Sequence, residues 1–290
     1  MMQIIRRTPV LRTAFAGPIA IRRAWLDYLD KPNRALFERF EEIVQSDVKV
    51  KVDEFQGEFV IGPRSHLLHR ILATGHYEPD LVKLFLSHLD PDRDVIDVGA
   101  NIGFFTVLAA RYLASGRVFG AEPTRAAFAR LQQNVASNGV ADKVILFNGL
   151  VSDALEDRAI RIVPGREEYS SVGAMVHPSI AGQELVTETI QAKPLDVLVK
   201  EHDLKPGLIK VDVEGAEAMV FAGAEETLKT HRPVVISECS RPLLERNGTS
   251  PEAIIALFDR CGYDVHDPHD PRAKPGARDF SDIVAIPRPG

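Results

Sequence analysis

A short apolar run that breaks into glycines restricts the fold of this chain more than any other feature. The run covers residues 94–105, with the sequence DVIDVGANIGFF, and Glu122 follows Gly103 by 19 residues at the end of a second apolar run. A strand, a glycine-containing turn, a helical pattern and a second strand that ends in a carboxylate make up the nucleotide-binding half of a doubly wound α/β sheet. The sequence therefore predicts that the chain holds an adenosine at this turn.

Strand and helix patterns alternate from this run to the end of the chain. Strands are predicted over residues 94–98, 117–121, 143–148, 207–212 and 233–238, and helices over residues 79–89, 103–114, 124–137, 215–230 and 251–260. Strands that alternate with helices of this length indicate a mostly parallel sheet with right-handed crossovers. Two further runs, residues 263–265 and 282–286, predict an antiparallel edge of this sheet at the C-terminus.

The flanking segments add a helical arm and an insertion. Residues 1–45 carry apolar positions at helical spacing, and residues 48–61 alternate like a hairpin. We therefore expect a helical arm with the start of a hairpin over 1–57, a candidate element for dimerisation, and an α/β domain over 58–290. After the third strand, residues 154–206 combine two β-patterned runs with a polar, turn-rich stretch, which predicts a β insertion that faces the substrate.

Charge and apolar patterning exclude several classes of protein. The net charge of −6 provides no overall basic field, so nucleic acid is not an expected partner. No apolar run reaches the roughly 20 residues that a membrane helix needs. Near the N-terminus, Pro18 interrupts an apolar run and Arg22 follows it at once, which is unlike a signal peptide. Cys239 and Cys261 have neither CxxC nor Cys/His spacing, so we expect reduced thiols in a cytoplasmic protein.

The residues of the glycine turn distinguish between adenosine cofactors. A dinucleotide fingerprint needs a glycine where the backbone approaches the pyrophosphate, but this chain has Asn101 there. Asp97 would also place a carboxylate near two phosphate charges. S-adenosylmethionine has no phosphate and carries a sulfonium and an ammonium group, so a nearby carboxylate favours its binding. Glu122 then has the position of a carboxylate that accepts hydrogen bonds from both ribose hydroxyls.

Further motifs follow the glycine turn in a fixed order. The complete set is Glu78-Pro79, the run from Val95 to Phe105, Ala121-Glu122-Pro123, Asn134, Val151-Ser152-Asp153, Pro194-Leu195-Asp196, the block IKVDVEGAE from Ile209 to Glu217, Arg232-Pro233 and Glu238. Over residues 57–238 this set resembles the FkbM-type family of class I methyltransferases, and the KVDVEGAE block is its most specific part. The resemblance implies a Rossmann-like fold and methyl transfer from S-adenosylmethionine, with S-adenosylhomocysteine as the product. It also implies an acceptor hydroxyl on a small metabolite, sugar or lipid.

The candidate cofactor site combines strand ends with neighbouring loops. Its expected members are Asp97, Gly99, Ala100, Asn101, Gly103, Phe104, Glu122, Pro123 and Asp212. Asn148 ends the third strand, where it is placed to meet the adenine amino group. The resemblance places the stretch around Tyr77 and Glu78 across the cofactor, so both are candidates to contact its methionine end; an N-cap role for this stretch is the alternative.

Candidate catalytic carboxylates lie at neighbouring strand ends. Asp212 ends the fourth parallel strand beside the expected methyl group, and Asp212 or Glu214 can act as general base, orient the cofactor or cap the next helix. Glu238 ends the adjacent strand, so Asp212 and Glu238 could share a divalent cation or raise one another's pKa. Two acids leave the octahedral coordination of Mg²⁺ incomplete, so no metal is expected.

The polar insertion supplies the remaining candidates. His177 is the best histidine candidate for a base. Tyr169, Ser170 and Ser171 lie near it in the sequence and are expected to face the substrate.

Two other functions remain open from the sequence. An NAD-dependent oxidoreductase or epimerase shares this type of sheet, but Asn101 and the absence of a Tyr-x-x-x-Lys pair disfavour it. An adenosine-binding module without catalysis would keep the same pocket. The sequence predicts a small-molecule or glycan acceptor without identifying it, and it does not determine the oligomeric state.

Overall fold

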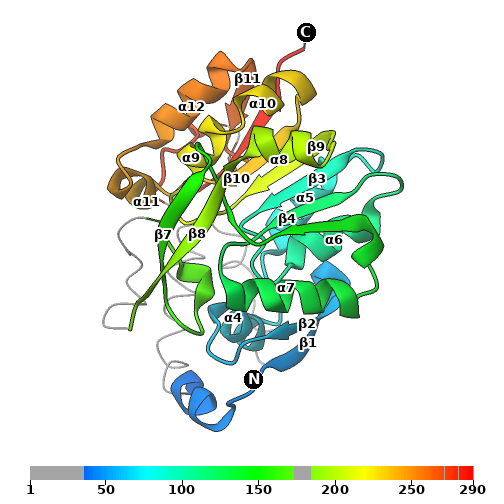
Figure 1. Ribbon diagram of the computed structural model, residues 1–290, viewed down its shortest axis with the longest axis vertical. Coiled ribbons are helices and arrows are strands. Elements are labelled where there is room, and N and C mark those ends of the chain that lie inside the picture. The colour runs from blue at the N-terminus through cyan, green and yellow to red at the C-terminus, as the bar shows by residue number, and fades with distance from the viewer. Residues whose placement is uncertain (1–35, 173–183, 271, 280, 290) are drawn as a thin grey trace, which may run out of the picture. The chain divides into compact units, whose positions relative to one another are not determined.

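The computed structural model describes residues 36–172, 184–270, 272–279 and 281–289 of two compact units (Figure 1). In the first unit, residues 1–46, the segment 36–43 is helical. Residues 1–35 of the predicted arm lie outside the described residues. All other elements belong to the second unit, residues 47–290. Among the described helices, none has both the length and the hydropathy of a membrane-crossing segment.

The main sheet of the second unit contains seven described strands in the order β11-β12-β10-β9-β3-β4-β5. Their bounds are β3 (Asp94–Val98), β4 (Val118–Ala121), β5 (Val144–Phe147), β9 (Pro206–Val211), β10 (Val234–Glu238), β11 (Tyr263–His266) and β12 (Asp282–Pro287). The five strands from β10 to β5 run parallel to one another. The predicted Rossmann-like, mostly parallel sheet is confirmed.

The C-terminal strand lies inside the sheet and not at its edge. β12 pairs antiparallel with β10 on one side and with β11 on the other. The predicted antiparallel pair at one edge of the sheet is confirmed: β11 is the edge strand and β12 lies next to it. Ile283, Val284 and Ala285 are buried in succession, as expected for an interior strand that is covered on both faces.

Helices cover both faces of the sheet, as Figure 1 shows. They are α4 (His66–Thr74), α5 (Pro79–Ser87), α6 (Phe104–Tyr112), α7 (Arg125–Ser137), α8 (Leu195–Glu201), α9 (Glu217–Ala222), α10 (Glu225–His231), α11 (Arg241–Arg246) and α12 (Pro251–Arg260). α8, α9, α10 and α12 share one apolar core with Ile96, Phe119 and Ile209 of the sheet. Right-handed crossovers place α6 and α7 on the opposite face, toward which Asp97 and Lys210 point because side chains alternate along a strand.

The helix predicted over residues 215–230 is divided into α9 and α10. Gly223 separates them and packs so closely that a Cβ would lie 1.9 Å from the carbonyl oxygen of Ser152. Asp196 then accepts a hydrogen bond from the backbone N–H of Thr227, at 2.7 Å, in the first turn of α10. Tertiary contact therefore interrupts a helical pattern that is continuous in the sequence.

Two smaller sheets flank the main one. β1 (Val48–Val52) and β2 (Gly57–Ile61) form the predicted hairpin, with the short η1 (Asp53–Phe55) between them. β6 (Leu150–Ser152), β7 (Glu156–Ile162) and β8 (Val186–Pro194) form the second sheet in the order β6-β8-β7. The predicted β insertion is confirmed by β7 and β8, which pair antiparallel.

Asn134 of α7 ties the hairpin to the glycine turn. Its Oδ1 accepts a hydrogen bond from the N–H of Val60 at 2.7 Å. Its Nδ2 donates to the carbonyl oxygens of Val60 at 3.2 Å and Ile102 at 2.8 Å. One fully buried side chain thus fixes both segments against α7.

The ends of β3 and β9 approach each other through Gly99. The N–H of Asp212 donates to the carbonyl oxygen of Val98 at 3.0 Å. Gly99 has φ +78°, and a Cβ at this position would lie 1.9 Å from the carbonyl oxygen of Asp212. Only glycine satisfies both the left-handed backbone and the close approach.

We predict that Gly99→Ala destabilises the protein by more than about 3 kcal/mol, because it adds a backbone clash to the cost of a left-handed alanine. Urea unfolding measures the loss. Gly139→Ala is the matched control: φ is +69° there and nothing lies within 4 Å of the added Cβ. It should lose only about 1–2 kcal/mol, and equal losses in the two variants would contradict the prediction.

Candidate functional site

A cavity opens at the carboxyl ends of β3 and β9, where the strand order of the sheet reverses direction. Ligands of open α/β sheets bind at such a switch point. The cavity walls come from the loop before α5, the glycine turn after β3, the ends of β4 and β9, and the insertion. One half carries Glu78, Asp97 and Asp212, and the other carries Glu122 and the insertion.

Asp97, Lys210 and Asp212 form a charge triad at the first half of the cavity. The register of β3 and β9 pairs Asp97 with Lys210. Lys210 Nζ lies 3.8 Å from Asp97 Oδ1 and 3.3 Å from Asp212 Oδ2. It also lies 4.9 Å from the ring centroid of Phe105. The lysine ammonium is therefore shared between two carboxylates and an aromatic face, away from bulk water.

The carboxylate of Asp97 is only partly satisfied within the protein. Oδ2 accepts a hydrogen bond from Thr106 Oγ1 at 2.7 Å. Oδ1 is buried and has no hydrogen-bond partner among the described residues. Since a buried unpaired carboxylate oxygen is costly, the open position next to the cavity suits a donor or a cation from a ligand.

Burial and neighbouring charges shift the pKa values of Asp97 and Lys210 in opposite directions. Burial raises the pKa of Asp97, while the positive charge of Lys210 and the hydrogen bond from Thr106 limit the rise. Burial by itself would lower the pKa of Lys210, but Asp212 and Asp97 outweigh it and raise this pKa. Lys210 therefore stays charged and offsets part of the negative charge around it.

Glu122, at the end of β4, organises the second half. Its Oε2 accepts a hydrogen bond from the N–H of Asn101 at 3.0 Å. Its Oε1 accepts from the N–H and the hydroxyl of Thr124, at 2.9 and 2.6 Å. Burial raises the pKa of Glu122 to about 7, against the effect of these hydrogen bonds. The side chain is thus fixed with its carboxylate at the cavity wall.

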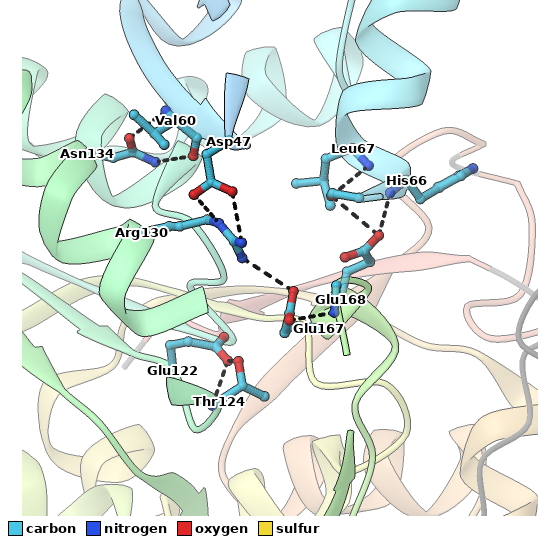
Figure 2. Close-up of polar contacts among 12 residues, drawn as sticks. Asp47, Val60, His66, Leu67, Glu122, Thr124, Arg130, Asn134, Glu167 and Glu168 are labelled. Carbon is cyan, nitrogen blue, oxygen red and sulfur yellow. Dashed lines mark hydrogen bonds and ion pairs between the residues drawn. The ribbon is translucent and has the colours of Figure 1, made fainter. Parts of the chain in front are cut away.

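The insertion is held over this half by carboxylates of η3 (Glu167–Tyr169), as Figure 2 shows. Arg130 of α7 pairs with both oxygens of Asp47 at 2.9 and 3.0 Å, and lies 3.5 Å from Glu167 Oε2. Glu168 Oε1 accepts a hydrogen bond from the backbone N–H of His66 at 2.5 Å, at the start of α4. Three segments far apart in the sequence therefore fix one wall of the cavity.

Three non-glycine residues with a left-handed backbone line the cavity. Glu78 has φ 45°, Asn101 has φ 51° and Glu214 has φ 53°. Such conformations cost on the order of 1–3 kcal/mol each and persist where surrounding structure or function imposes them. Their convergence makes this cavity the candidate functional site of the described part of the chain.

Most of the sequence-predicted residues meet in this cavity. Those that line it are Glu78, Asp97, Gly99, Ala100, Asn101, Phe104, Glu122, Pro123, Ser170, Ser171, Asp212 and Glu214. His177 lies outside the described residues.

Four predicted residues are not among those that line the cavity. Gly103 begins α6 with φ 94°, and Asn148 donates to the carbonyl oxygens of Glu122 and Pro123 at 2.8 and 3.1 Å. Asn148 Nδ2 thus braces the β4 loop, and the contact of Asn148 with adenine stays a prediction. Tyr169 is buried beside the ring of His66, and Glu238 ends β10 outside the residues that line the cavity.

Glu238 is a neighbour of Asp212 without sharing the cavity. The parallel register of β9 and β10 places the two strand ends side by side. Burial, and then the negative charges of Glu214 and Asp212, raise the pKa of Glu238 well above its ordinary value. Among the described residues, no group of three or more His, Cys, Asp and Glu side chains is arranged to hold a metal ion.

The sequence prediction missed several residues of the site. Lys210 was visible in the KVDVEGAE block, and the alternation of side chains along β9 places it on the same face as Asp212. Glu167 and Glu168 of the insertion also line the cavity. Their sequence carries no recognisable signal, because their position depends on contacts with α4 and α7.

Comparison with known proteins gives one family. The sequence matches the family model described as "Methyltransferase FkbM domain" over residues 97–265. It is similar to the hexuronic acid methyltransferase AglP of Haloferax volcanii, with 29% identity over 163 residues that cover 55% of this chain and 61% of AglP. It is also similar to the 31-O-demethyl-FK506 methyltransferase FkbM of Streptomyces tacrolimicus, with 26% identity covering 65% of this chain and 80% of that protein. The chain thus spans less than two thirds of AglP.

Two solved methyltransferase structures show a lower level of similarity. An O-methyltransferase from Bacillus cereus, in complex with SAH, aligns with 16% identity and a TM-score of 0.45, covering 88% of this chain and 97% of that chain. A methyltransferase FkbM from Methylobacillus flagellatus aligns with 15% identity and a TM-score of 0.42, covering 88% of this chain and 59% of that chain.

We predict that Lys210→Met lowers the free energy of unfolding by about 3–5 kcal/mol at pH 8, because it leaves the buried carboxylate of Asp97 without its cation. The loss should be smaller at pH 5.5, since burial raises the pKa of Asp97 and protonation can then neutralise this carboxylate. Urea unfolding at both pH values measures it. Lys229→Met, which breaks an exposed pair with Glu225, should cost less than about 0.5 kcal/mol. A similar, pH-independent loss in both variants would exclude the charge triad as the cause.

Proposed function

Because the chain belongs to the FkbM methyltransferase family, whose domain model matches more than half of it, we propose that it methylates a hydroxyl of a small metabolite, sugar or glycolipid with S-adenosylmethionine as the methyl donor. The observation that carries the choice of donor is Asp97 Oδ1, which is buried at the cavity and accepts no hydrogen bond among the described residues. A pyrophosphate would be repelled there, whereas a cationic ligand would be attracted.

The arrangement of carboxylates supports two separate contacts with the donor. In our proposal, Asp97 and Glu78 face its charged methionine end, and Glu122 accepts hydrogen bonds from its ribose hydroxyls. Glu122 is already held by Asn101 and Thr124, so no side-chain ordering is needed when the ligand arrives. Gly99, Ala100, Phe104 and Pro123 supply the close-packed walls around it.

The proposed chemistry places few demands on the protein. S-adenosylmethionine, when bound, supplies a methyl group on a sulfonium leaving group, so the protein mainly aligns the acceptor. Alignment alone can contribute on the order of 7–11 kcal/mol in well-oriented reactions. Asp212, at the tip of β9, is the proposed group that accepts the hydrogen bond and then the proton of the acceptor hydroxyl.

Other candidate bases receive less support. Glu214 lines the cavity in a left-handed conformation and remains an alternative to Asp212. Glu238 is not among the residues that line the cavity, so we assign it no contact with substrate. His177 stays a prediction. Ser170 and Ser171 of the insertion line the cavity and are proposed to contact the acceptor.

An oxygen acceptor is supported by the names of the relatives. FkbM of Streptomyces tacrolimicus is named for a 31-O-demethyl acceptor, and AglP is named for a hexuronic acid. Since the chain spans less than two thirds of AglP, we extend to this chain only the class of a hydroxyl-bearing acceptor.

The first test is calorimetry with S-adenosylmethionine and NAD. We expect binding of S-adenosylmethionine alone, and Glu122→Gln should weaken it about 10- to 100-fold because hydrogen bonds to a charged acceptor contribute roughly 1.5–3 kcal/mol. The exposed Glu245→Gln is the control and should bind like the parent protein. Binding of NAD in preference would refute the proposal.

The second test addresses the base. With radiolabelled methyl donor and a panel of hydroxylated acceptors, Asp212→Asn should lower methyl transfer about 10²- to 10⁴-fold, the usual effect of removing a general base. Its affinity for S-adenosylmethionine should change far less than its rate. The exposed Asp264→Asn serves as control. Full activity of Asp212→Asn would remove Asp212 from the proposal, and donor binding without turnover on any acceptor would favour a non-catalytic module.

A further inference from the structure

Glu78 lines the cavity and does not cap the helix that it precedes. It is the N-cap residue of α5, yet its side chain makes no capping hydrogen bond, and its backbone has φ 45° and ψ 49°. Ser65 and Ser250, the N-cap residues of α4 and α12, do accept such bonds from their helices. The left-handed conformation of Glu78 therefore turns a carboxylate to the cavity at the expense of a helix cap.

The groups that face Glu78 come from three other elements. Arg70 Nη1 of α4 lies 3.6 Å from Glu78 Oε1. The negative charges of Asp212 at the end of β9 and Asp282 of β12 raise the pKa of Glu78, and the positive charges of Arg70 and Lys210 lower it. Burial is the largest influence, and together these groups raise the pKa to about 7. The Glu78 side chain is still 27% exposed, so a ligand and a proton can both reach it.

The charge of Glu78 changes the balance of this half of the cavity. Asp97, Asp212 and Lys210 together carry one net negative charge. An ionised Glu78 makes this two, and a protonated Glu78 leaves it at one. The donor and its product differ by one positive charge, because methyl transfer converts a sulfonium into a neutral thioether. The charge of Glu78 therefore affects the affinity for the donor more than the affinity for the product.

We propose that Glu78 is a specificity-determining residue: the protein binds S-adenosylmethionine with release of a proton from Glu78, and Glu78 takes a proton back from solvent when the cavity holds S-adenosylhomocysteine. This rests on the proposed use of S-adenosylmethionine. Its consequence is that the protein prefers the donor over the product near and above neutral pH and loses this preference in acid. This preference favours the replacement of bound S-adenosylhomocysteine by S-adenosylmethionine.

The direction of the pH dependence follows from linkage. Below about pH 7, the sulfonium must first displace the Glu78 proton, so donor affinity falls as the pH falls. Above that pH the carboxylate is already ionised and the affinity levels off. The product carries no sulfonium and should show a much weaker dependence. The ratio of the two dissociation constants therefore reports the effect of Glu78, because groups that affect both affinities equally cancel in it.

Calorimetric titration with S-adenosylmethionine and S-adenosylhomocysteine between pH 6.0 and 7.5 tests the proposal. In the parent protein, the preference for the donor should rise roughly tenfold over this range, as expected for one proton with a pKa near 7. In Glu78→Gln, the ratio of the two dissociation constants should stay near its value at acid pH and lose most of its rise with pH. The cofactor's own amino group titrates in both proteins, so its contribution cancels in the comparison. Asp80→Asn, an exposed change in the first turn of the same helix, should behave like the parent.

A second variant protects the test against a misfolded Glu78→Gln. Arg70→Met removes the positive charge 3.6 Å from Glu78, so the midpoint of the pH profile should move to higher pH. A preference that is independent of pH in the parent protein, or equally dependent on pH in Glu78→Gln, would overturn the proposal. Failure of both ligands to bind the folded parent protein would instead refute the proposed function.

Discussion

The buried ammonium of Lys210 is the interaction on which the rest of the site depends. It lies within 4 Å of both Asp97 and Asp212, so it offsets the charges of the buried Asp97 and the partly exposed Asp212 at neighbouring strand ends. The pairing exists only because β3 and β9 are adjacent, parallel and in a register that aligns Asp97 with Lys210. That register in turn needs Gly99, where no side chain fits. The charge arrangement of the site therefore depends on the strand order and on the close approach of the backbone at Gly99.

The walls around this charge triad differ in how they are held. The glycine turn and the ends of β3, β4 and β9 are part of the rigid sheet. The insertion is attached by side chains, through Arg130 with Glu167 and through Glu168 with the start of α4. One part of the cavity is therefore built by the sheet itself, and the other depends on side-chain contacts that join the insertion to α4 and α7.

The sequence predicted the elements that follow local rules and missed those set by distant contacts. Strands β3, β4 and β9 and the residues at their ends were predictable, because apolar runs that end in glycine or carboxylate have few other interpretations. The interior place of β12 was not, since its pairing depends on where β11 lies. The place of Glu168 at the cavity was not predictable for the same reason, because it depends on contact with α4. Lys210 required the register of two strands that are more than a hundred residues apart.

Asn134 links the stability of the hairpin to that of the glycine turn. A two-stranded hairpin such as β1 and β2 is at best marginally stable by itself. Its attachment to α7 spans 74 residues of sequence and uses the same side chain that holds Ile102 in the glycine turn. A hairpin that detaches from α7 therefore leaves this side chain with fewer fixed partners beside the turn. Slow amide exchange in β2 would accordingly report how firmly the wall of the cavity is held, at a strand that is not itself part of that wall.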